Sequence, residues 1–517
     1  MKFYLYFSAF ITGLASLAVE LAASRLLGAY FGTSNLVWAA IIGLILLYLT
    51  AGYFLGGAWA DRSPRPLTLY AIMAWAGLGV ALVPVVARPL LLRAATAFDQ
   101  LQIGVLLGAF FSVLVLFSVP ITLLGMVSPF VIRIVLGGER GGTSRSGHVA
   151  GRVYAVSTLG SFVGTFLPDL LLIPLLGTRR TFLLLGLELV LTALLGMALT
   201  RPRRALLYLW MPVLIAALWI GWANKPIKNT AGQIYETESA YNYIQVLQVG
   251  DFRLLRLNEG QGIHSVYHPK QLAYHGSWMM FLAAPYFYAK PSPPRRMAIV
   301  GLAAGTVARQ ATAAFGPIPI DGYEIDPEIV RVGYRYFGLD ALPNLNAHIE
   351  DGRVGIRRSP YRYDLIVVDA FRPPYIPWHL TTREFFELLK ARLSERGAVA
   401  VNVGILPDDR RLMDDIAATM RAVFPSVYAA RVPNAFNAIV YATNQPTHWG
   451  NLTANLKAMQ NSPATPLLLV QAMEMAVGNR LRLGHGEVFT DDRAPVDLIT
   501  DSMVLRYALE ASDAAIR

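Results

Sequence analysis

The chain has 517 residues, of which 55% are hydrophobic and 15% charged, and its mean hydropathy of +0.44 excludes an ordinary soluble globular protein. Because the chain contains no cysteine, a disulfide framework, a thiolate zinc site and a cysteine nucleophile are also excluded. The formal charge of +11 does not indicate nucleic-acid binding, since many of the cations stand in short loops between apolar runs.

Residues 1–224 carry nearly uninterrupted apolar runs and are predicted to form a transmembrane helical domain. A bilayer span needs roughly 20 mostly apolar residues. About seven segments meet this requirement: 4–27, 36–60, 67–92, 103–135, 151–176, 179–200 and 205–224. The fourth contains Pro120 and Pro129, so we expect either one kinked helix or a span followed by an interfacial piece.

Lysine and arginine are distributed unevenly over the predicted loops. With a cytoplasmic N-terminus, only Arg93, Arg179 and Arg180 fall on the outer side. The cations on the inner side are then Lys2, Arg62, Arg65, Arg133, Arg140, Arg145, Arg201, Arg203 and Arg204. The positive-inside rule therefore favours an N-terminus in the cytoplasm.

Glu20, Asp169 and Glu188 fall within apolar runs, where an ionisable group is expensive unless it has a partner or a wet cavity. Such groups can mark a substrate or proton path. We favour pairing between helices, for example with Arg25 or Arg152, or a position close to the lipid headgroups.

Residues 230–290 are predicted to form a small β-hairpin module with a linker. The segments 243–249 and 252–257 have the pattern of two strands around Gly250-Asp251. A proline-rich linker at residues 290–295 separates this module from the rest.

Residues 291–517 are predicted to form an α/β Rossmann-like domain of the AdoMet-methyltransferase type. The predicted strands, which alternate with helices, are 297–301, 318–325, 347–350, 365–369, 398–403, 427–432 and 438–443. This alternation indicates a mostly parallel sheet flanked by helices. Ligands bind such sheets at the carboxyl ends of the strands, so the residues just after each strand are the candidate site residues.

Glycines and acids occupy these positions. The small-residue turn from Gly301 to Thr306, with Gly305, follows the first strand and would let backbone amides approach a ligand. Glu324 ends the second strand, 23 residues after Gly301, where a carboxylate is suited to accept both hydroxyls of a ribose. Asp351-Gly352 follows the third strand and Asp369 the fourth, where a carboxylate could accept a proton from an attacking amine.

Together these residues resemble those of spermidine synthases, the aminopropyltransferases, and more closely the membrane-fused spermidine-synthase-like proteins. The resemblance covers roughly residues 236–445, with a further matching segment near the C-terminus. Its motifs are Glu238-Ser-Ala-Tyr241, Gln261, Tyr274-His275, Gly301 to Thr306, Glu324-Ile-Asp326, Asp351-Gly352, Asp369, His379-Leu-Thr-Thr-Arg-Glu-Phe385 and Thr490-Asp-Asp-Arg-Ala-Pro-Val496.

The resemblance implies a membrane-anchored transferase with decarboxylated S-adenosylmethionine or S-adenosylmethionine as co-substrate and no metal. Glu324 would bind the ribose, Asp351 the adenine, and Asp369 would accept the proton of the attacking amine. The other implied residues are Gln261, Gly301, Gly305 and Gly352 for the adenosyl ligand, and Tyr274, His275 and Arg372 for the acceptor. We further expect the lipid bilayer and a small-molecule amine or lipid-borne acceptor as partners, no nucleic acid, and a homodimer as one option.

Three positions depart from soluble spermidine synthases. Those proteins carry acids where this chain has Ala304, Arg372 and Gly276. Because a diamine binds through charge-assisted bonds to carboxylates, we expect an acceptor other than putrescine. An AdoMet-dependent methyltransferase and a non-catalytic transport or scaffold protein with a degenerate synthase domain stay open as alternatives.

The side of the membrane on which the soluble domain lies is the last open question. Seven spans from a cytoplasmic N-terminus would place the domain outside, although its expected nucleoside ligand is cytosolic. Either the number of spans is even, or the domain is periplasmic and not an enzyme. We favour the first, with a multi-pass protein of the inner membrane and a cytoplasmic soluble domain.

Overall fold

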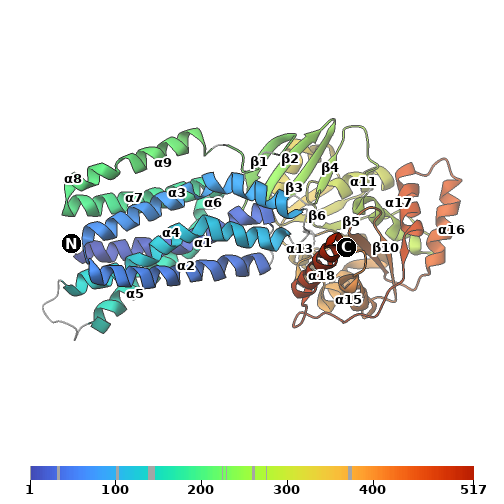
Figure 1. Ribbon diagram of the computed structural model, residues 1–517. Coiled ribbons are helices and arrows are strands. Elements are labelled where there is room, and N and C mark those ends of the chain that lie inside the picture. Colours follow the sequence, from blue (N-terminus) through green and yellow to red (C-terminus); the bar gives the residue numbers. More distant parts are fainter. Residues whose placement is uncertain are drawn as a thin grey trace. The chain divides into compact units, whose positions relative to one another are not determined.

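The computed structural model describes residues 2–31, 35–99, 104–137, 146–223, 225–228, 230–258, 262–274, 276–370 and 375–516. Two compact units make up the chain. Unit 1 consists of Met1–Asn229, Thr237–Tyr243 and Ala514–Arg517, and unit 2 of Thr230–Glu236 and Ile244–Asp513. Figure 1 shows the helices of unit 1 in blue to green and the strands of unit 2 in light green to red.

Unit 1 is a bundle of long apolar helices. Its elements are α1 (Lys2–Phe31), α2 (Asn35–Arg62), α3 (Pro66–Asp99), α4 (Gly104–Gly137), α5 (Ser146–Leu167), the π-helical turn η2 (Pro168–Leu172), α6 (Ile173–Leu176), α7 (Thr178–Thr200), α8 (Pro202–Ala205), η3 (Leu206–Tyr208) and α9 (Trp210–Gly221). Within the described residues, seven segments are long and apolar enough to cross a membrane. Each of them overlaps one of the seven predicted segments, of which residues 103 and 224 lie outside the described residues.

Helix α4 decides between the two expectations for the fourth segment. Pro120 and Pro129 both lie inside one continuous helix, so the segment is a single helix and not a span plus a separate piece.

Asp169 forms an ion pair with Arg25, with 4.0 Å between the Arg25 Nε and Asp169 Oδ1 atoms. Pairing between helices is therefore confirmed for this acid.

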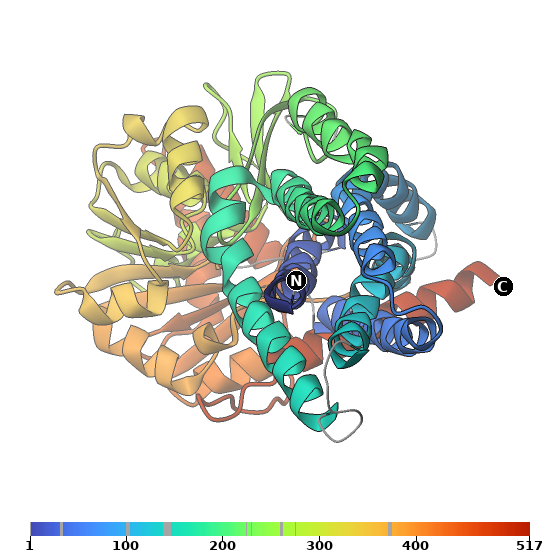
Figure 2. The same ribbon diagram turned by 90° about the vertical axis from the view of Figure 1, so that its left-hand side faces the viewer.

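The centre of unit 1 is α1, which packs against α5, α4 and α7; Figure 2 views the bundle along its helices, with the N-terminus of α1 in the middle. Glycines permit the close approach of α1 and α5, since a Cβ atom at Gly160 or Gly164 would overlap the backbone of Phe10 or Leu14. The Ser161 hydroxyl donates to the Gly13 carbonyl at 3.1 Å across the same contact. Small residues thus allow backbone-to-backbone packing.

A four-stranded sheet precedes the larger domain. Its order is β1 (Gln233–Glu238), β2 (Tyr243–Val249), β3 (Phe252–Leu257) and β4 (Ser265–Tyr267). Strands β2 and β3 form the predicted antiparallel hairpin, with Val249 paired to Phe252 across the turn at Gly250.

The main sheet of unit 2 has eight strands in the order β12-β10-β11-β9-β8-β5-β6-β7. The strands are β5 (Met297–Val300), β6 (Ile320–Glu324), β7 (Leu345–Ile349), β8 (Tyr363–Val368), β9 (Leu393–Gly404), β10 (Ser426–Arg431), β11 (Asn437–Thr443) and β12 (Arg480–Leu481). Strands β7, β6, β5, β8 and β9 are parallel, and β11, β10 and β12 join antiparallel. All seven predicted strands are present in a Rossmann-like sheet of the methyltransferase type, and only the two-residue β12 was not predicted.

Helices cover both faces of this sheet. They are α11 (Thr306–Phe315), α12 (Pro327–Tyr336), α13 (Gly352–Arg358), α14 (Arg383–Arg392), α15 (Arg411–Arg421), α16 (Trp449–Gln460), α17 (Leu467–Gly478) and α18 (Val496–Ile516), after the short α10 (Ser277–Met280). Along β5, Met297 and Ile299 enter one apolar core, and Ala298 and Val300 enter the other. Because side chains alternate along a strand, a strand buried on both faces is apolar throughout.

Candidate functional site

The carboxyl ends of four adjacent parallel strands bring the predicted acids to one edge of the sheet. Val300 of β5 pairs with Tyr323 of β6 on one side and with Val368 of β8 on the other. Glu324 is the last residue of β6, Asp369 directly follows β8, and Asp351 lies two residues after β7. These three carboxylates, separated by up to 45 positions in the sequence, therefore flank the turn that begins at Gly301.

That turn approaches the neighbouring strands closely. Gly301 has a φ of +89°, and a Cβ atom there would lie 2.7 Å from the Asp369 carbonyl oxygen. Gly305, with a φ of +84°, directly precedes α11. The backbone amide of Ala304 donates to the Ser265 hydroxyl of β4 at 2.9 Å, which attaches the turn to the smaller sheet. Glycine is required at Gly301 by both conformation and space.

Glu324 is held by two backbone amides. Its Oε2 atom accepts from the Ala303 amide at 2.9 Å, and its Oε1 atom from the Asp326 amide at 3.1 Å. The side chain is 8% exposed, and burial raises the pKa of Glu324 to about 7, with the nearby Asp326 charge adding to the rise. At neutral pH the carboxylate and carboxylic acid forms of Glu324 are therefore both populated.

Asp369 is oriented by a chain of amide side chains. The Asn402 amide of β9 donates to its Oδ1 atom at 2.8 Å, and the Asn437 amide of β11 donates to the Asn402 oxygen at 2.9 Å. Part of Asp369 stays open to solvent, but the surrounding protein raises its pKa to about 7, against the opposing effect of the Asn402 bond. A carboxyl with this pKa can accept a proton near neutral pH.

Asp351 forms a hydrogen bond with a residue from a distant motif. Its Oδ2 atom lies 2.9 Å from the His379 Nε2 atom, and its Oδ1 atom accepts from the Val354 amide at 3.0 Å as the N-cap of α13. The His379 bond is the main reason why the pKa of Asp351 is lowered. Asp351 is thus ionised at neutral pH and fixed in orientation.

Asp491, near the C-terminus, contacts the residues next to Asp351 and His379. Arg353 donates to both carboxylate oxygens of Asp491, at 2.8 and 2.6 Å, and to the His379 carbonyl at 2.9 Å. Thr382 also donates to Asp491, at 2.7 Å. Residues 490–496 are therefore attached to the loop that carries His379. The residue patterns at single strand ends do not predict this contact, although both motifs are visible in the sequence.

Two further predicted residues, Gly352 and Tyr274, lie within the described part of the chain. Gly352 begins α13, and a Cβ atom there would lie 2.5 Å from the Val300 side chain, so glycine lets α13 approach β5. The Tyr274 hydroxyl accepts from the His268 amide at 2.9 Å and donates to the Gln271 carbonyl at 2.6 Å, within its own loop.

Gln261, His275 and Arg372 lie outside the described residues, so their assignments stay predictions. Across the part of the chain that the structure describes, no group of three or more His, Asp or Glu side chains is arranged to hold a metal ion.

Fold and site together define a Rossmann-like domain of the methyltransferase type with three acids at the carboxyl ends of its parallel strands. The spermine/spermidine synthase domain family matches residues 285–453. The polyamine aminopropyltransferase of Vibrio vulnificus is 33% identical over 208 residues, which cover 39% of this chain and 68% of that protein. The chain therefore belongs to the polyamine aminopropyltransferase, or spermidine synthase, family.

Further similarities have lower sequence identity. The probable polyamine aminopropyl transferase of Bifidobacterium longum is 27% identical over 279 residues, 51% of this chain and 61% of that protein. The mouse eEF1A lysine and N-terminal methyltransferase is 28% identical over 163 residues, 30% of this chain and 23% of that protein. A solved structure of a probable spermidine synthase from Corynebacterium glutamicum aligns with a TM-score of 0.39 and 21% identity over 51% of this chain and 99% of that chain.

Proposed function

We propose that this protein is a membrane-anchored transferase of the aminopropyltransferase type. It binds decarboxylated S-adenosylmethionine, or a related adenosyl ligand, and transfers a group to an amine acceptor, free or lipid-borne, that is not putrescine. The seven long apolar helices of unit 1 support the anchoring. We place the protein in the inner membrane with unit 2 in the cytoplasm.

The observation that carries the proposal is the position and the raised pKa of Asp369. Asp369 directly follows a central parallel strand, is oriented by Asn402 and has a pKa of about 7. In the proposed step, the amine attacks the carbon bonded to the sulfonium, a carbon–nitrogen bond forms and a carbon–sulfur bond breaks. The electron pair moves to sulfur, which leaves as the neutral thioether methylthioadenosine, and the proton lost by the amine goes to Asp369.

Two further acids support an adenosine ligand. Glu324 lies at the end of β6, where a carboxylate can accept from ribose hydroxyls. Asp351, fixed by His379 and ionised, can accept from the exocyclic amine of adenine.

The surroundings of Ala304 support an acceptor other than putrescine. Its methyl group is fully buried in an apolar cluster with residues of β2, β3 and α12. Because this position has no carboxylate, it cannot attract the second ammonium group of a diamine such as putrescine.

Product analysis with the full-length purified protein tests the proposal. Decarboxylated S-adenosylmethionine and a panel of amines should give methylthioadenosine, measured by mass spectrometry. Asp369→Asn should abolish product while keeping nucleoside binding, whereas Asp340→Asn, at an exposed position on η5 (Leu339–Ala341), should not change the rate. Glu324→Gln should weaken nucleoside binding about 10- to 100-fold, because it removes a charged acceptor.

A methyltransferase is the second candidate. The same sheet order and ribose acid serve methyl transfer, and the similarity to the eEF1A lysine and N-terminal methyltransferase favours it. S-adenosylhomocysteine as the product from S-adenosylmethionine would replace the first proposal by this one. No binding of any adenosyl ligand would contradict both and favour a non-catalytic protein.

A further inference from the structure

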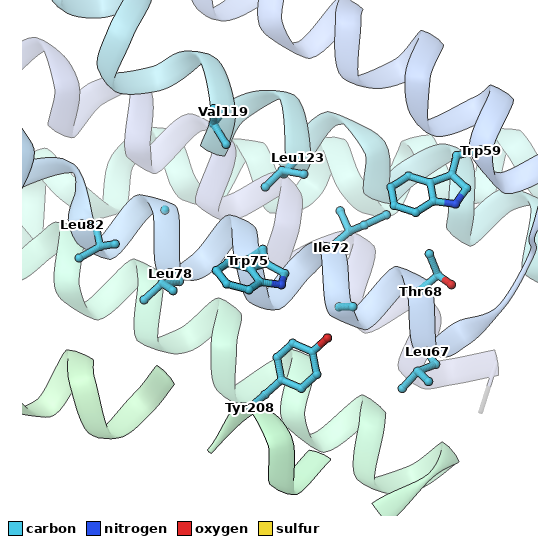
Figure 3. Close-up of a pocket in the computed structure, with 12 residues that line it drawn as sticks. Trp59, Leu67, Thr68, Ile72, Trp75, Leu78, Leu82, Val119, Leu123 and Tyr208 are labelled. Carbon is cyan, nitrogen blue, oxygen red and sulfur yellow. The ribbon is translucent and has the colours of Figure 1, made fainter. Parts of the chain in front are cut away.

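Unit 1 contains an apolar groove that the proposed transfer reaction does not use. The groove has a volume of about 650 Å³. It is lined along one side by α3, from Leu67 to Leu82, and is completed by Trp59 of α2, Val119 and Leu123 of α4, and Tyr208 of η3. In Figure 3 the labelled side chains of α3 lie between those of α4 and Tyr208.

The groove is longer than the hydrocarbon part of one leaflet of a bilayer. Fifteen residues separate Leu67 from Leu82, which corresponds to about 22 Å along a helix at roughly 1.5 Å per residue. Half of a hydrocarbon core of about 30 Å is about 15 Å. The groove is therefore long enough to hold an acyl chain that spans one leaflet, and its lining is mostly apolar.

One end of the groove is polar. Thr68, with a hydroxyl, and Trp59, with an indole, line it on α3 and α2, and Tyr208 presents its hydroxyl toward α3 in Figure 3. Tryptophan and tyrosine at the end of an apolar surface are typical of the membrane–water interface.

Five arginines stand at this same end of the helices. Arg62 and Arg65 flank the connection from α2 to α3, and Arg201, Arg203 and Arg204 flank α8; all five are exposed. Within the described parts of the chain, no carboxylate lies within 4.0 Å of these five guanidinium groups. The nearby Asp61 is paired with Arg133 at 3.0 Å. The end of the groove therefore carries uncompensated positive charge that complements an anion.

We propose that this groove binds an anionic membrane phospholipid, with an acyl chain along α3 and the phosphate among the arginines of the α2–α3 and α7–α8 connections. The apolar lining explains the affinity for the chain, and the cation cluster explains the preference for a negatively charged headgroup. The inference rests on the proposed insertion of unit 1 into a membrane, but it requires no activity of unit 2.

Native mass spectrometry of the full-length protein in detergent tests this inference. Added dioleoyl phosphatidylglycerol should give a retained one-lipid adduct, and dioleoyl phosphatidylcholine should bind at least about tenfold more weakly. The double variant Arg203→Gln/Arg204→Gln should weaken phosphatidylglycerol binding about 25-fold, since each cation near an anionic lipid contributes about fivefold. Ala71→Phe, which fills the groove, should remove the adduct of either lipid.

Matched controls separate the groove from the general surface. Arg152→Gln removes an exposed cation on α5, and Leu159→Phe enlarges an exposed apolar side chain there; neither should change lipid binding. Equal binding of the two lipids, or unchanged phosphatidylglycerol binding in both the arginine variant and Ala71→Phe, would overturn the inference. A phosphatidylglycerol adduct that is lost in Ala71→Phe but keeps its full affinity in the arginine variant would overturn the role of the arginines.

The arginine variant changes only exposed side chains, so the test survives even if Ala71→Phe fails to fold. Extraction of the protein from membranes by alkaline carbonate would contradict the insertion itself. Membrane retention without a preference for phosphatidylglycerol would contradict only the groove.

Discussion

At the scale of single residues, Asp369 and Asn402 determine the chemistry available to the site. Among the described residues Asp369 forms no ion pair with a cation, and it accepts from the neutral Asn402 amide. A neutral donor stabilises the carboxylate less than a cation would, so burial dominates and the pKa rises to about 7. The residue is thereby suited to take a proton and not only to bind a charge.

This arrangement predicts a pH dependence. Because the deprotonated form of Asp369 is the proposed base, kcat/KM should fall as the pH drops through about 7. Asn402→Leu removes the bond that lowers the pKa of Asp369, so the acid limb should move to higher pH. Initial rates from pH 5.5 to 9 measure this shift.

A control is needed because Glu324 also has a pKa of about 7. Glu324→Gln should keep the acid limb that Asp369 causes, at a higher KM. An acid limb that stays in place in Asn402→Leu would show that Asp369 is not the titrating base.

Gly301 supports a prediction from local geometry. Gly301→Ala adds a Cβ atom 2.7 Å from the Asp369 carbonyl oxygen at a φ of +89°. Gly250→Ala is the matched control, since its φ is +59° and no atom lies within 4 Å of the added Cβ.

Both variants should lose about 1–2 kcal/mol from the positive φ, and Gly301→Ala about 1–3 kcal/mol more from the overlap. Thermal unfolding followed by intrinsic fluorescence measures the difference. Equal losses in the two variants would contradict the close approach of β5 and β8.

At the scale of secondary-structure elements, the C-terminal segment positions two helices of the site. Asp491 accepts hydrogen bonds from Arg353 at the start of α13 and from Thr382, the N-cap of α14. Arg353 in turn holds the His379 carbonyl, and His379 pairs with Asp351. The position of Asp351 therefore depends on a residue 140 positions later in the sequence.

Asp491→Ala tests this connection. The variant removes acceptors of three hydrogen bonds, and since the Asp491 side chain is 41% exposed we expect a modest loss of about 1–2 kcal/mol. Glu487→Ala, which breaks an exposed pair with Arg493 in the same segment, should change stability by less than about 0.5 kcal/mol.

Nucleoside affinity is the second measurement on these variants, because Asp351 is expected to reorient when His379 loses its support. Unchanged affinity in Asp491→Ala would restrict the C-terminal segment to a stabilising role.

At the scale of the whole molecule, the side of the membrane occupied by unit 2 is decided by the number of crossings. The chain has no cysteine, so single cysteines can report this directly. Ser63→Cys lies between α2 and α3, and Ser462→Cys at an exposed position of unit 2. An impermeant maleimide applied to inside-out and right-side-out vesicles then labels each site from one side.

A cytoplasmic unit 2 predicts that both cysteines react from the cytoplasmic side. This outcome requires an even number of crossings, and the segment Pro202–Gly221 is the shortest of the seven, with 20 residues. Labelling of Ser462→Cys from the outer side would contradict the cytoplasmic placement.

The sequence by itself determined the apolar helical part, the hairpin, the parallel strands and the acids at their ends. These features follow from local patterns: runs of about 20 apolar residues, apolar segments bounded by glycine, and acids placed directly after them. Glu324 and Asp369 could be predicted because the carboxyl ends of neighbouring parallel strands meet at one edge.

Only the tertiary structure decided which partners surround those acids. Asn402, His379 and Asp491 come from elements 28 to 140 positions away from the acids they serve, and no local pattern specifies such contacts. The pKa values of Glu324 and Asp369 depend on burial by the whole domain, because the cost of a charge is set by the surrounding protein and not by neighbours in the sequence.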